Sequence, residues 1–251
     1  MQAKLLVGFH AVTARLRARP QSLRAVYIDQ RRRDGRMLAL LDALASRGVR
    51  PMAVAAERLD AMCGGTRHQG VVAQADAGDR ALSLDELLPE LHSRSVLLLL
   101  DGVEDPRNLG ACLRVADGAG AAAVIVPRDR AVGLTAVAEK AASGAAETVP
   151  LISVTNLARA LEQLAEAQVW LVGADAGAEQ DVFELDLRGP CAWVVGAEGR
   201  GLRRLTRENC DQLARIPMYG TCESLNASVA AALGLYAMRR RCGPPLRSNP
   251  G

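Results

Sequence analysis

The sequence predicts an α/β protein with a small N-terminal α/β domain and a larger C-terminal domain built on a mostly parallel sheet. From Val96 onward, short apolar runs alternate with amphipathic segments, a pattern typical of buried parallel strands that helices cover on both faces. Hydrophobic residues make up 49% of the chain and aromatic residues only 3%, so the core must consist mainly of Ala, Leu and Val. The length of 251 residues allows one or two domains.

The N-terminal domain is predicted over residues 1–75, where strand and helix patterns alternate. An amphipathic helix is predicted at 36–47, with Gly48 at its C-terminal cap. The predicted strands are 25–29, 49–55 and 70–74. The chain then loses its periodicity and turns acidic, which predicts a linker over residues 76–94.

The C-terminal domain is predicted over residues 95–243, and the Pro- and Gly-rich residues 244–251 are predicted to be a disordered tail. The predicted strands are 96–100, 123–126, 148–154, 169–174, 192–195 and 213–218. The predicted helices are 109–119, 134–145, 156–167, 201–209 and 225–241. Three polar insertions interrupt this scaffold at strand ends, where open α/β sheets place their ligands.

The net charge of +3 hides a marked asymmetry along the chain. Residues 1–75 contain 13 Lys and Arg against 5 Asp and Glu, whereas residues 96–251 contain 16 against 18. A local basic excess of this size is typical of a surface that meets phosphate groups. A merely solvated basic face is the alternative on charge alone.

The cysteines and histidines favour neither a metal site nor a disulfide framework. The six cysteines contain no C-x-x-C pair, and the three histidines form no H-x-x-x-H or H-x-E pattern, so we predict no metal. The apolar runs are far shorter than the roughly 20 residues that cross a bilayer. The N-terminus lacks the features of an export signal, so we predict a cytoplasmic protein without membrane contact.

The first polar insertion, residues 101–114, directly follows a predicted strand. Pro106 stiffens the loop, and Asn108 stands where its side chain could cap the next helix. Arg114 lies more than one turn inside that helix, where a surface ion pair with Asp117 is the simplest alternative to a functional role.

The second insertion, residues 194–201, is a glycine-rich turn between a strand and a helix. Its G-x-x-G-x-G spacing differs from both the dinucleotide-binding fingerprint and the phosphate-binding loop of nucleotide hydrolases. Glycines there allow a ligand or another backbone to approach closely, although a purely structural turn explains them equally well.

The third insertion, residues 216–228, joins a strand end to the last helix. Ser224, Asn226 and Ser228 are polar residues of the kind that cap helices. The apolar Ile216-Pro-Met218 beside them could flank a flat ring while backbone groups contact its edge.

Taken in order, the three insertions resemble the three sequence motifs of the TrmH/RlmB family of SPOUT RNA methyltransferases. The first motif, D-P-x-N-x-G-x-x-x-R, is present as residues 105–114, and the second, G-x-E-x-x-G-L, as residues 196–202. The third resembles I-P-M followed by S-L-N-x-S, within residues 216–228. Residues 8–12 and 67–71 resemble the two ends of a ribosomal-protein-like domain that precedes the catalytic domain in some members.

The resemblance implies a parallel sheet whose C-terminal segment is threaded into a trefoil knot, a rare exception to the rule against threaded chains. It implies that the knot loops bind S-adenosylmethionine. The residues expected to contact this cofactor are Gly196, Ile216, Met218, Ser224, Leu225 and Ser228. It also implies a homodimer formed through the catalytic domain; the apolar positions Leu225, Val229, Leu233 and Tyr236 of the last helix would contribute, or would pack internally.

The implied reaction is methyl transfer to a ribose 2′-oxygen, and the residues expected to take part are Asn108, Arg114, Glu198 and Asn226. This arginine is often described as a general base, but a guanidinium stays protonated and cannot accept a proton. We therefore expect Arg114 to stabilise the developing alkoxide or to anchor the adjacent phosphate. Asn108, Glu198 and Asn226 would orient it and the loops.

The family members with a separate N-terminal domain modify a guanosine in the peptidyl-transferase region of 23S rRNA. The basic residues 1–75 therefore favour 23S rRNA, or a large-subunit assembly intermediate, as the substrate. A tRNA ribose methyltransferase and a non-catalytic RNA-binding assembly factor are the alternatives. A dehydrogenase is disfavoured, because the strand ending at Leu100 leads into Asp-Gly-Val-Glu instead of G-x-G-x-x-G.

Overall fold

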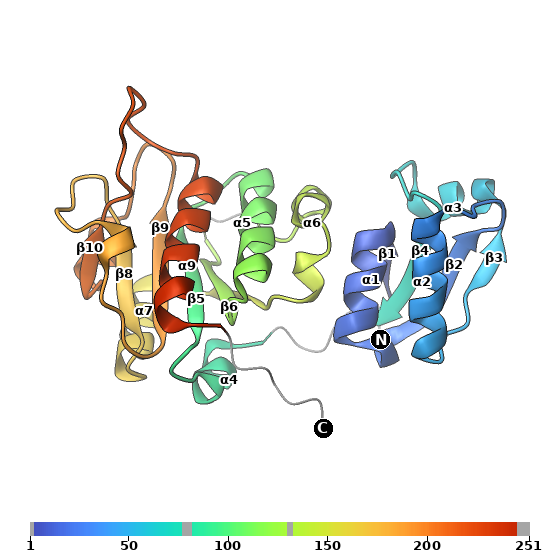
Figure 1. Ribbon diagram of the computed structural model, residues 1–251, viewed down its shortest axis with the longest axis horizontal. Coiled ribbons are helices and arrows are strands. Elements are labelled where there is room, and N and C mark those ends of the chain that lie inside the picture. The colour runs from blue at the N-terminus through green and yellow to red at the C-terminus, as the bar shows by residue number, and fades with distance from the viewer. Residues whose placement is uncertain (1–2, 77–81, 130–132, 245–251) are drawn as a thin grey trace. The chain divides into compact units, whose positions relative to one another are not determined.

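The computed structural model describes residues 3–76, 82–129 and 133–244, and the chain divides into two compact units (Figure 1). Unit 1 contains Met1–Ala81 together with the short segment Ser143–Thr148. Unit 2 contains Leu82–Ala142 and Val149–Gly251. The domain boundaries inferred from the sequence remain a prediction.

Unit 1 is a four-stranded sheet with helices on both faces. In sheet order its strands are β1 (Ala3–Val7), β4 (Val71–Asp76), β2 (Leu23–Asp29) and β3 (Met52–Val54). Strand β4 runs antiparallel to both neighbours, and β3 runs parallel to β2. Two helices, α1 (Phe9–Ala18) and α2 (Gly35–Ser46), bury one face of the sheet, while α3 (Ala56–Cys63) packs on the other.

Alternation of side chains along β4 explains how both faces become covered. Val71, Ala73 and Ala75 enter the core beneath α1 and α2, whereas Val72 faces α3. The predicted helix 36–47 is confirmed as α2, but its C-terminal cap is Arg47, and Gly48 follows the cap with φ 69°.

Unit 2 is a six-stranded parallel sheet, which confirms the predicted fold class. In sheet order its strands are β10 (Gln212–Ala214), β8 (Trp170–Ala174), β9 (Cys191–Gly196), β5 (Val96–Asp101), β6 (Ala123–Pro127) and β7 (Leu151–Val154). Every pair of neighbouring strands is parallel. The six residues of β5 are all buried, as expected for a central strand covered on both faces.

Helices cover both faces of this sheet. One face carries α5 (Pro106–Ala119) and α9 (Ala227–Cys242), which stand in front of the strands in Figure 1, and α6 (Ala136–Ala142) packs against α5. The other face carries α4 (Leu84–Leu87) and α7 (Leu157–Glu166), and α8 (Arg204–Glu208) contacts α7. None of the described helices is long and apolar enough to cross a membrane.

Several predicted element bounds in unit 2 are wrong. The strand predicted at 213–218 ends at Ala214, because its partner strand β8 ends at the paired residue Ala174. The strand predicted at 148–154 begins only at Leu151, after a 3₁₀ turn. The helices predicted at 134–145 and 201–209 correspond to α6 and α8, which are both shorter than predicted.

Two predictions fall partly outside the described residues. Within the predicted linker 76–94, residues 77–81 are not described, and α4 packs Leu84 and Leu87 into the core of unit 2. A capping box between Ser83 and Glu86 begins this helix. Of the predicted tail 244–251, only Pro244 is described.

Candidate functional site

The candidate site lies at the carboxyl edge of the sheet of unit 2, where β5 and β9 end together. The two strands are direct parallel neighbours, and Asp101 at the end of β5 pairs with Gly196 at the end of β9. The loops that follow the strands, residues 102–105 and 197–203, therefore leave the sheet side by side. These loops contain the first and second sequence motifs.

The loop after β9 folds back tightly on the strand from which it leaves. The Gly201 N–H donates to the carbonyl of Ala197 over 2.9 Å. A Cβ atom on Gly196 would come within 2.1 Å of the Gly201 backbone, and Gly199 and Gly201 have φ values of 77° and 65°. Only glycine fits these positions, so the G-x-x-G-x-G spacing is required by the shape of the loop.

A buried carboxylate joins the two loops. Asp101 is 1% exposed, and its Oδ2 accepts the backbone N–H of Arg203 over 2.9 Å. Its Oδ1 lies 3.5 Å from Nε of the same arginine and accepts no hydrogen bond from the described residues. Asp101 therefore anchors the exit of the loop after β9 to the end of β5. The sequence motifs do not point to this residue, although a charged residue that ends an apolar strand is a usable signal.

The start of α5 differs from the prediction that Asn108 caps this helix. The N-terminal cap is Asp105, whose side chain accepts the backbone N–H of Arg107 over 2.8 Å. Pro106 occupies the first helical turn, where its missing N–H has no cost. Asn108 therefore lies inside the helix, and its side chain is available for another contact.

That contact is with the N-terminus of the last helix. Asn226 Nδ2 donates to Asn108 Oδ1 over 3.0 Å. Asn226 is also the cap of α9, because its Oδ1 accepts from the backbone N–H and the hydroxyl of Ser228 at 2.9 and 2.7 Å. Two predicted site residues from motifs far apart in the chain thus meet, and a chain of hydrogen bonds joins α5 to α9.

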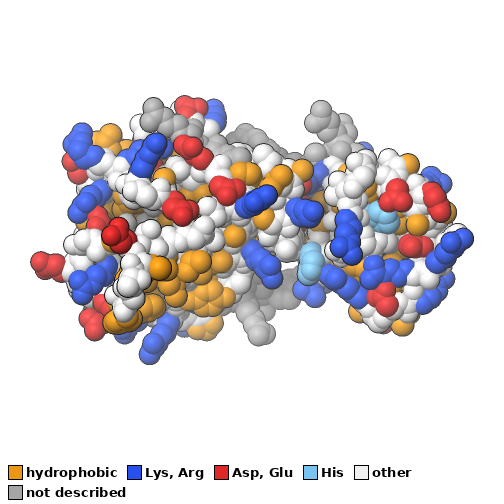
Figure 2. All heavy atoms as spheres, turned by 90° about the horizontal axis from the view of Figure 1, so that it is seen from above, with side chains coloured by type: hydrophobic (Ala, Val, Ile, Leu, Met, Phe, Trp, Pro, Cys, Tyr) orange, Lys and Arg blue, Asp and Glu red, His pale blue; other side chains and the backbone are white. Residues whose placement is uncertain are grey.

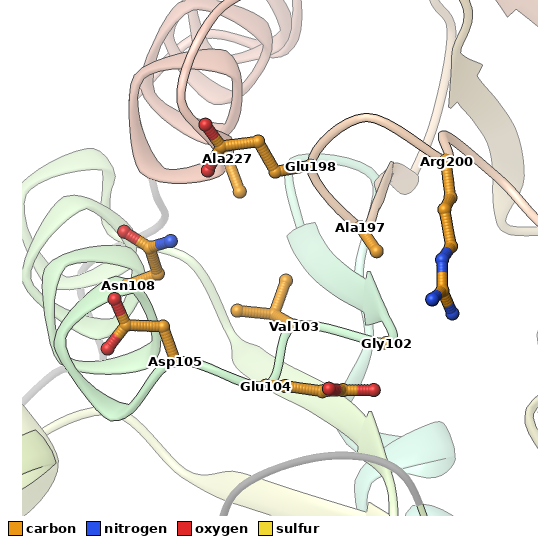
Figure 3. Close-up of a pocket in the computed structure, with 9 residues that line it drawn as sticks. All are labelled: Gly102, Val103, Glu104, Asp105, Asn108, Ala197, Glu198, Arg200 and Ala227. Atoms are coloured by element: carbon orange, nitrogen blue, oxygen red, sulfur yellow. The ribbon is translucent and has the colours of Figure 1, made fainter.

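A cavity of about 300 Å³ opens between these elements (Figure 3). Asp105 and Asn108 lie on one side, while Ala197, Glu198 and Arg200 contribute from the loop after β9. The remaining lining residues are Gly102, Val103, Glu104 and Ala227. This volume is at the lower end of the range of small-molecule sites, about 300–1,000 Å³.

The structure brings together some of the predicted site residues and leaves others apart. Asn108 and Glu198 line the cavity, Asn226 contacts Asn108, and Gly196 and Ser228 are next to lining residues in the chain. The cofactor contacts predicted in the segment before α9 do not line it. Ile216 and Leu225 are half-buried, and Met218 and Ser224 are exposed.

Arg114 lies outside the cavity. It is exposed on α5, one turn and a half beyond Asn108, and it forms no hydrogen bond or ion pair with another described residue. The surface ion pair with Asp117 that the spacing allows is absent from the described contacts. An exposed guanidinium without a partner carboxylate is available for a substrate.

The polar groups of the site are amides, carboxylates and arginines. Among the described residues, no group of three or more His, Cys, Asp and Glu side chains could hold a metal ion. Cys210, near the loop after β9, is no candidate nucleophile, because burial, assisted by Asp211 and Asp101, raises the pKa of its thiol to about 12. The site is therefore suited to positioning and to electrostatic stabilisation.

Sequence comparisons agree with the architecture of the chain. The profile of the SpoU rRNA Methylase family matches residues 95–236, and that of RNA 2′-O ribose methyltransferase substrate binding matches residues 5–80. A Bordetella pertussis protein named 23S rRNA (guanosine-2′-O-)-methyltransferase RlmB is 55% identical over 241 residues. That alignment covers 96% of this chain and 98% of the relative.

Structural comparisons extend the likeness to solved proteins. The SpoU methyltransferase AviRb from Streptomyces viridochromogenes, solved in complex with the cofactor AdoMet, superimposes with a TM-score of 0.74 at 26% identity. That superposition covers 95% of this chain and 90% of AviRb. The A. aeolicus TrmH/SpoU tRNA modifying enzyme has a TM-score of 0.52 at 26% identity, covering 63% of this chain and 81% of that enzyme.

Proposed function

The chain belongs to the SpoU rRNA methylase family, and from this premise we propose that it methylates the ribose 2′-oxygen of a guanosine in 23S rRNA, with S-adenosylmethionine as methyl donor. One observation carries the proposal: a relative with that activity in its name is 55% identical over 96% of this chain. Both units contribute to that likeness. The location of the guanosine in the peptidyl-transferase region is part of the same proposal.

A tRNA substrate is the alternative, because one of the similar solved structures is a tRNA modifying enzyme. The A. aeolicus tRNA enzyme matches 63% of this chain, whereas the rRNA enzyme of B. pertussis matches 96%. The matched substrate-binding profile at residues 5–80 supports an RNA substrate. A non-catalytic assembly factor is disfavoured, because every residue of the three motifs is present.

The cofactor is proposed to bind at the loop after β9, which contributes Ala197, Glu198 and Arg200 to the cavity. Gly196 lets Gly201 and Leu202 lie directly against the strand end, so the loop after β9 stays close to the end of its strand. We assign binding of S-adenosylmethionine to Gly196, Ile216, Met218, Ser224, Leu225 and Ser228. For the residues of the segment before α9, this assignment rests on the motif and requires the segment to lie against the ligand.

The chemistry requires alignment of the ribose hydroxyl and stabilisation of charge on its oxygen. S-adenosylmethionine, when bound, supplies an electrophilic methyl group. Asn108 and Asn226 hold the first turn of α5 against the start of α9, and Glu198 lines the cavity together with Asn108. As the proton of the 2′-hydroxyl passes to water, the Arg114 guanidinium stabilises the negative charge that develops on the oxygen.

The active form is proposed to be a cytoplasmic homodimer that contacts 23S rRNA or a large-subunit assembly intermediate. Support for the dimer comes from α9, where Val229 and Tyr236 are 44% and 53% exposed on one helix face. Internal packing therefore does not account for these two apolar side chains. Figure 2 shows hydrophobic side chains gathered on one side of unit 2.

The test is to map 2′-O-methylation in RNA from cells that lack this protein. A lost guanosine mark in 23S rRNA, restored by the purified protein with S-adenosylmethionine, is the expected result. A mark lost from tRNA instead would contradict the proposed substrate. Isothermal titration tests the remaining alternative, a non-catalytic assembly factor. Such a protein would show no binding of S-adenosylmethionine.

A further inference from the structure

The sheet of unit 1 brings three separate chain segments to one edge. Strands β1 and β2 end there, and β4 begins there because it runs antiparallel to both. Gly8 N–H donates to Val71 and Asp29 N–H donates to Gly70, each over 2.9 Å, so the connections are held closely together. We call residues 8–10, 30–36 and 64–70 the loop edge.

Arginines on the loop edge are held in place by an aromatic ring. The guanidinium groups of Arg32 and Arg36 lie 4.7 and 4.6 Å from the centre of the Phe9 ring. Arg36 Nη2 also lies 2.9 Å from His10 Nε2, and Arg32 bonds to the Gln69 carbonyl and to Asp34. Because these groups are already ordered, binding a ligand costs little side-chain entropy.

Further arginines on the same edge are exposed. Residues 31–36 contain four arginines and one aspartate, and Arg67 lies in the neighbouring loop. The acidic groups nearby are already engaged: Asp34 caps α2 and pairs with Arg32, Asp60 pairs with His68, and Asp29 accepts the Arg31 backbone N–H. Among the described residues around this edge, Glu57 at the start of α3 is the acidic group that remains.

Within the described residues, the exposed arginines Arg31, Arg33, Arg36 and Arg67 form no ion pair with a carboxylate. In Figure 2, Lys and Arg side chains are numerous on the face of unit 1 turned to the viewer. The loop edge therefore offers positive charge that the protein itself does not neutralise.

We propose that the loop edge binds the sugar-phosphate backbone of the RNA substrate. This inference rests on the proposed function and adds to it the surface that meets the RNA. Phosphates are favoured over bases, because the Phe9 ring is 3% exposed and lies beneath two guanidinium groups, so no base can stack on it. Contacts of this kind give affinity and orientation without reading sequence.

The opposite edge of the same sheet supplies a matched control. There Arg24 is paired with Asp76 at the end of β4, and Arg15 is buried against Glu147. Arg17 and Arg50 are exposed on that edge. Removing these two changes the net charge as much as removing Arg31 and Arg33.

The experiment compares Arg31→Ala/Arg33→Ala with Arg17→Ala/Arg50→Ala in the full chain. Binding of a 23S rRNA fragment is measured at several salt concentrations, and thermal unfolding checks that both variants fold. The loop-edge variant should bind about tenfold more weakly, and the slope of log K against log salt should fall by about 0.7–0.9 for each phosphate that is no longer neutralised. The control variant should match the wild type.

The proposal would be overturned if both variants bound the 23S rRNA fragment equally weakly. It would also be overturned if the salt dependence of binding were unchanged in the loop-edge variant. If the wild type methylates 23S rRNA but the loop-edge variant binds it normally, only this surface assignment fails. A wild type that neither binds nor methylates 23S rRNA would remove the proposed function as well. Binding of S-adenosylmethionine should be the same in all three proteins.

Discussion

Arg114 is the residue on which the proposed chemistry depends most. Its guanidinium is exposed on α5 and is not engaged by a carboxylate of the described residues, so it is free to meet a ribose oxygen or a phosphate. Removing one charged donor to a developing oxyanion typically costs about 10²–10³ in rate. We expect Arg114→Ala to lower kcat by about 100-fold while the affinity for S-adenosylmethionine stays unchanged.

The measurement is single-turnover methyl transfer to a 23S rRNA fragment, with cofactor binding followed by isothermal titration. Arg114→Lys should recover only part of the rate, because lysine keeps the charge but has no planar pair of donors. Arg159→Ala, an exposed arginine on α7, is the control and should keep the wild-type rate. Methyl transfer within a few-fold of wild type in Arg114→Ala would show that this residue has no such role.

Cys242 provides a second prediction at the scale of single residues. Its Sγ lies 3.3 Å from that of Cys191, and the hydrogen bond from Cys191, aided by the charge of Arg239, lowers the pKa of the Cys242 thiol to about 7. Burial raises the pKa of the Cys112 thiol to about 12. Because the thiolate is the reactive form, Cys242 should be unreactive well below pH 7 and should reach half of its maximal alkylation rate near pH 7.

The measurement is iodoacetamide labelling followed by peptide mass spectrometry, with Cys222→Ser used to remove the exposed thiol in the segment before α9. Cys112 should stay unlabelled over the same pH range and serves as the internal control. A midpoint for Cys242 close to 9, the ordinary value for a cysteine, would show that its two neighbours do not act on it in solution.

Gly234 determines how closely α9 packs on the sheet. A Cβ at this position would come within 2.1 Å of the ring of Trp193, a side chain of β9 with no exposed surface. The indole N–H donates to the Ala230 carbonyl over 3.1 Å, so the ring cannot simply turn away. Gly234→Ala should therefore lower the free energy of unfolding by about 1–3 kcal/mol, despite the higher helix propensity of alanine.

Thermal unfolding measures this effect, and Gly118→Ala is the matched control. Gly118 also lies in a helix, but its added Cβ would meet only the Tyr236 hydroxyl at 3.0 Å, the far end of a side chain that can move. That variant should be neutral or slightly stabilised. Equal loss of stability in both variants would mean that the contact with Trp193 is not what limits Gly234.

The elements that the sequence predicted well are those whose pattern is local. Strand β5 and helix α7 have continuous or periodic apolar positions, and both appear within two residues of their predicted bounds. Helix α1 was not predicted, because its buried face includes Arg15. This arginine is buried through its pairing with Glu147, which lies 132 residues further along the chain, and through hydrogen bonds to Ser22 and the Asp76 carbonyl. No local pattern contains that information.

The candidate site also combines residues that a local motif can predict with residues whose role depends on contacts distant in the chain. The motifs predicted Asn108, Glu198 and Asn226 as site residues, and the fold brings the first two to one cavity and the third into contact with Asn108. The role of Asp101 was not predictable, because it depends on β5 and β9 being neighbours although about 90 residues separate them in sequence. The knot inferred from the resemblance, and contacts from the segment before α9, remain predictions.

At the scale of the whole molecule, the exposed apolar face of α9 predicts self-association. Val229 and Tyr236 are separated by seven residues and therefore share one helix face, where Leu233 is half-buried between them. A charge placed in such a patch would have to be desolvated in a dimer but not in a monomer. Val229→Asp/Tyr236→Asp should therefore shift the protein from dimer to monomer, as measured by size-exclusion chromatography with light scattering.

Leu205→Asp is the control for this last prediction, because Leu205 is 53% exposed on α8, away from the face of α9. It should leave the dimer intact. If α9 forms the interface, the double variant should also lose methyl transfer more strongly at low than at high protein concentration, since association precedes activity. A wild type that is monomeric at every concentration, yet active, would show that the exposed face of α9 serves another purpose.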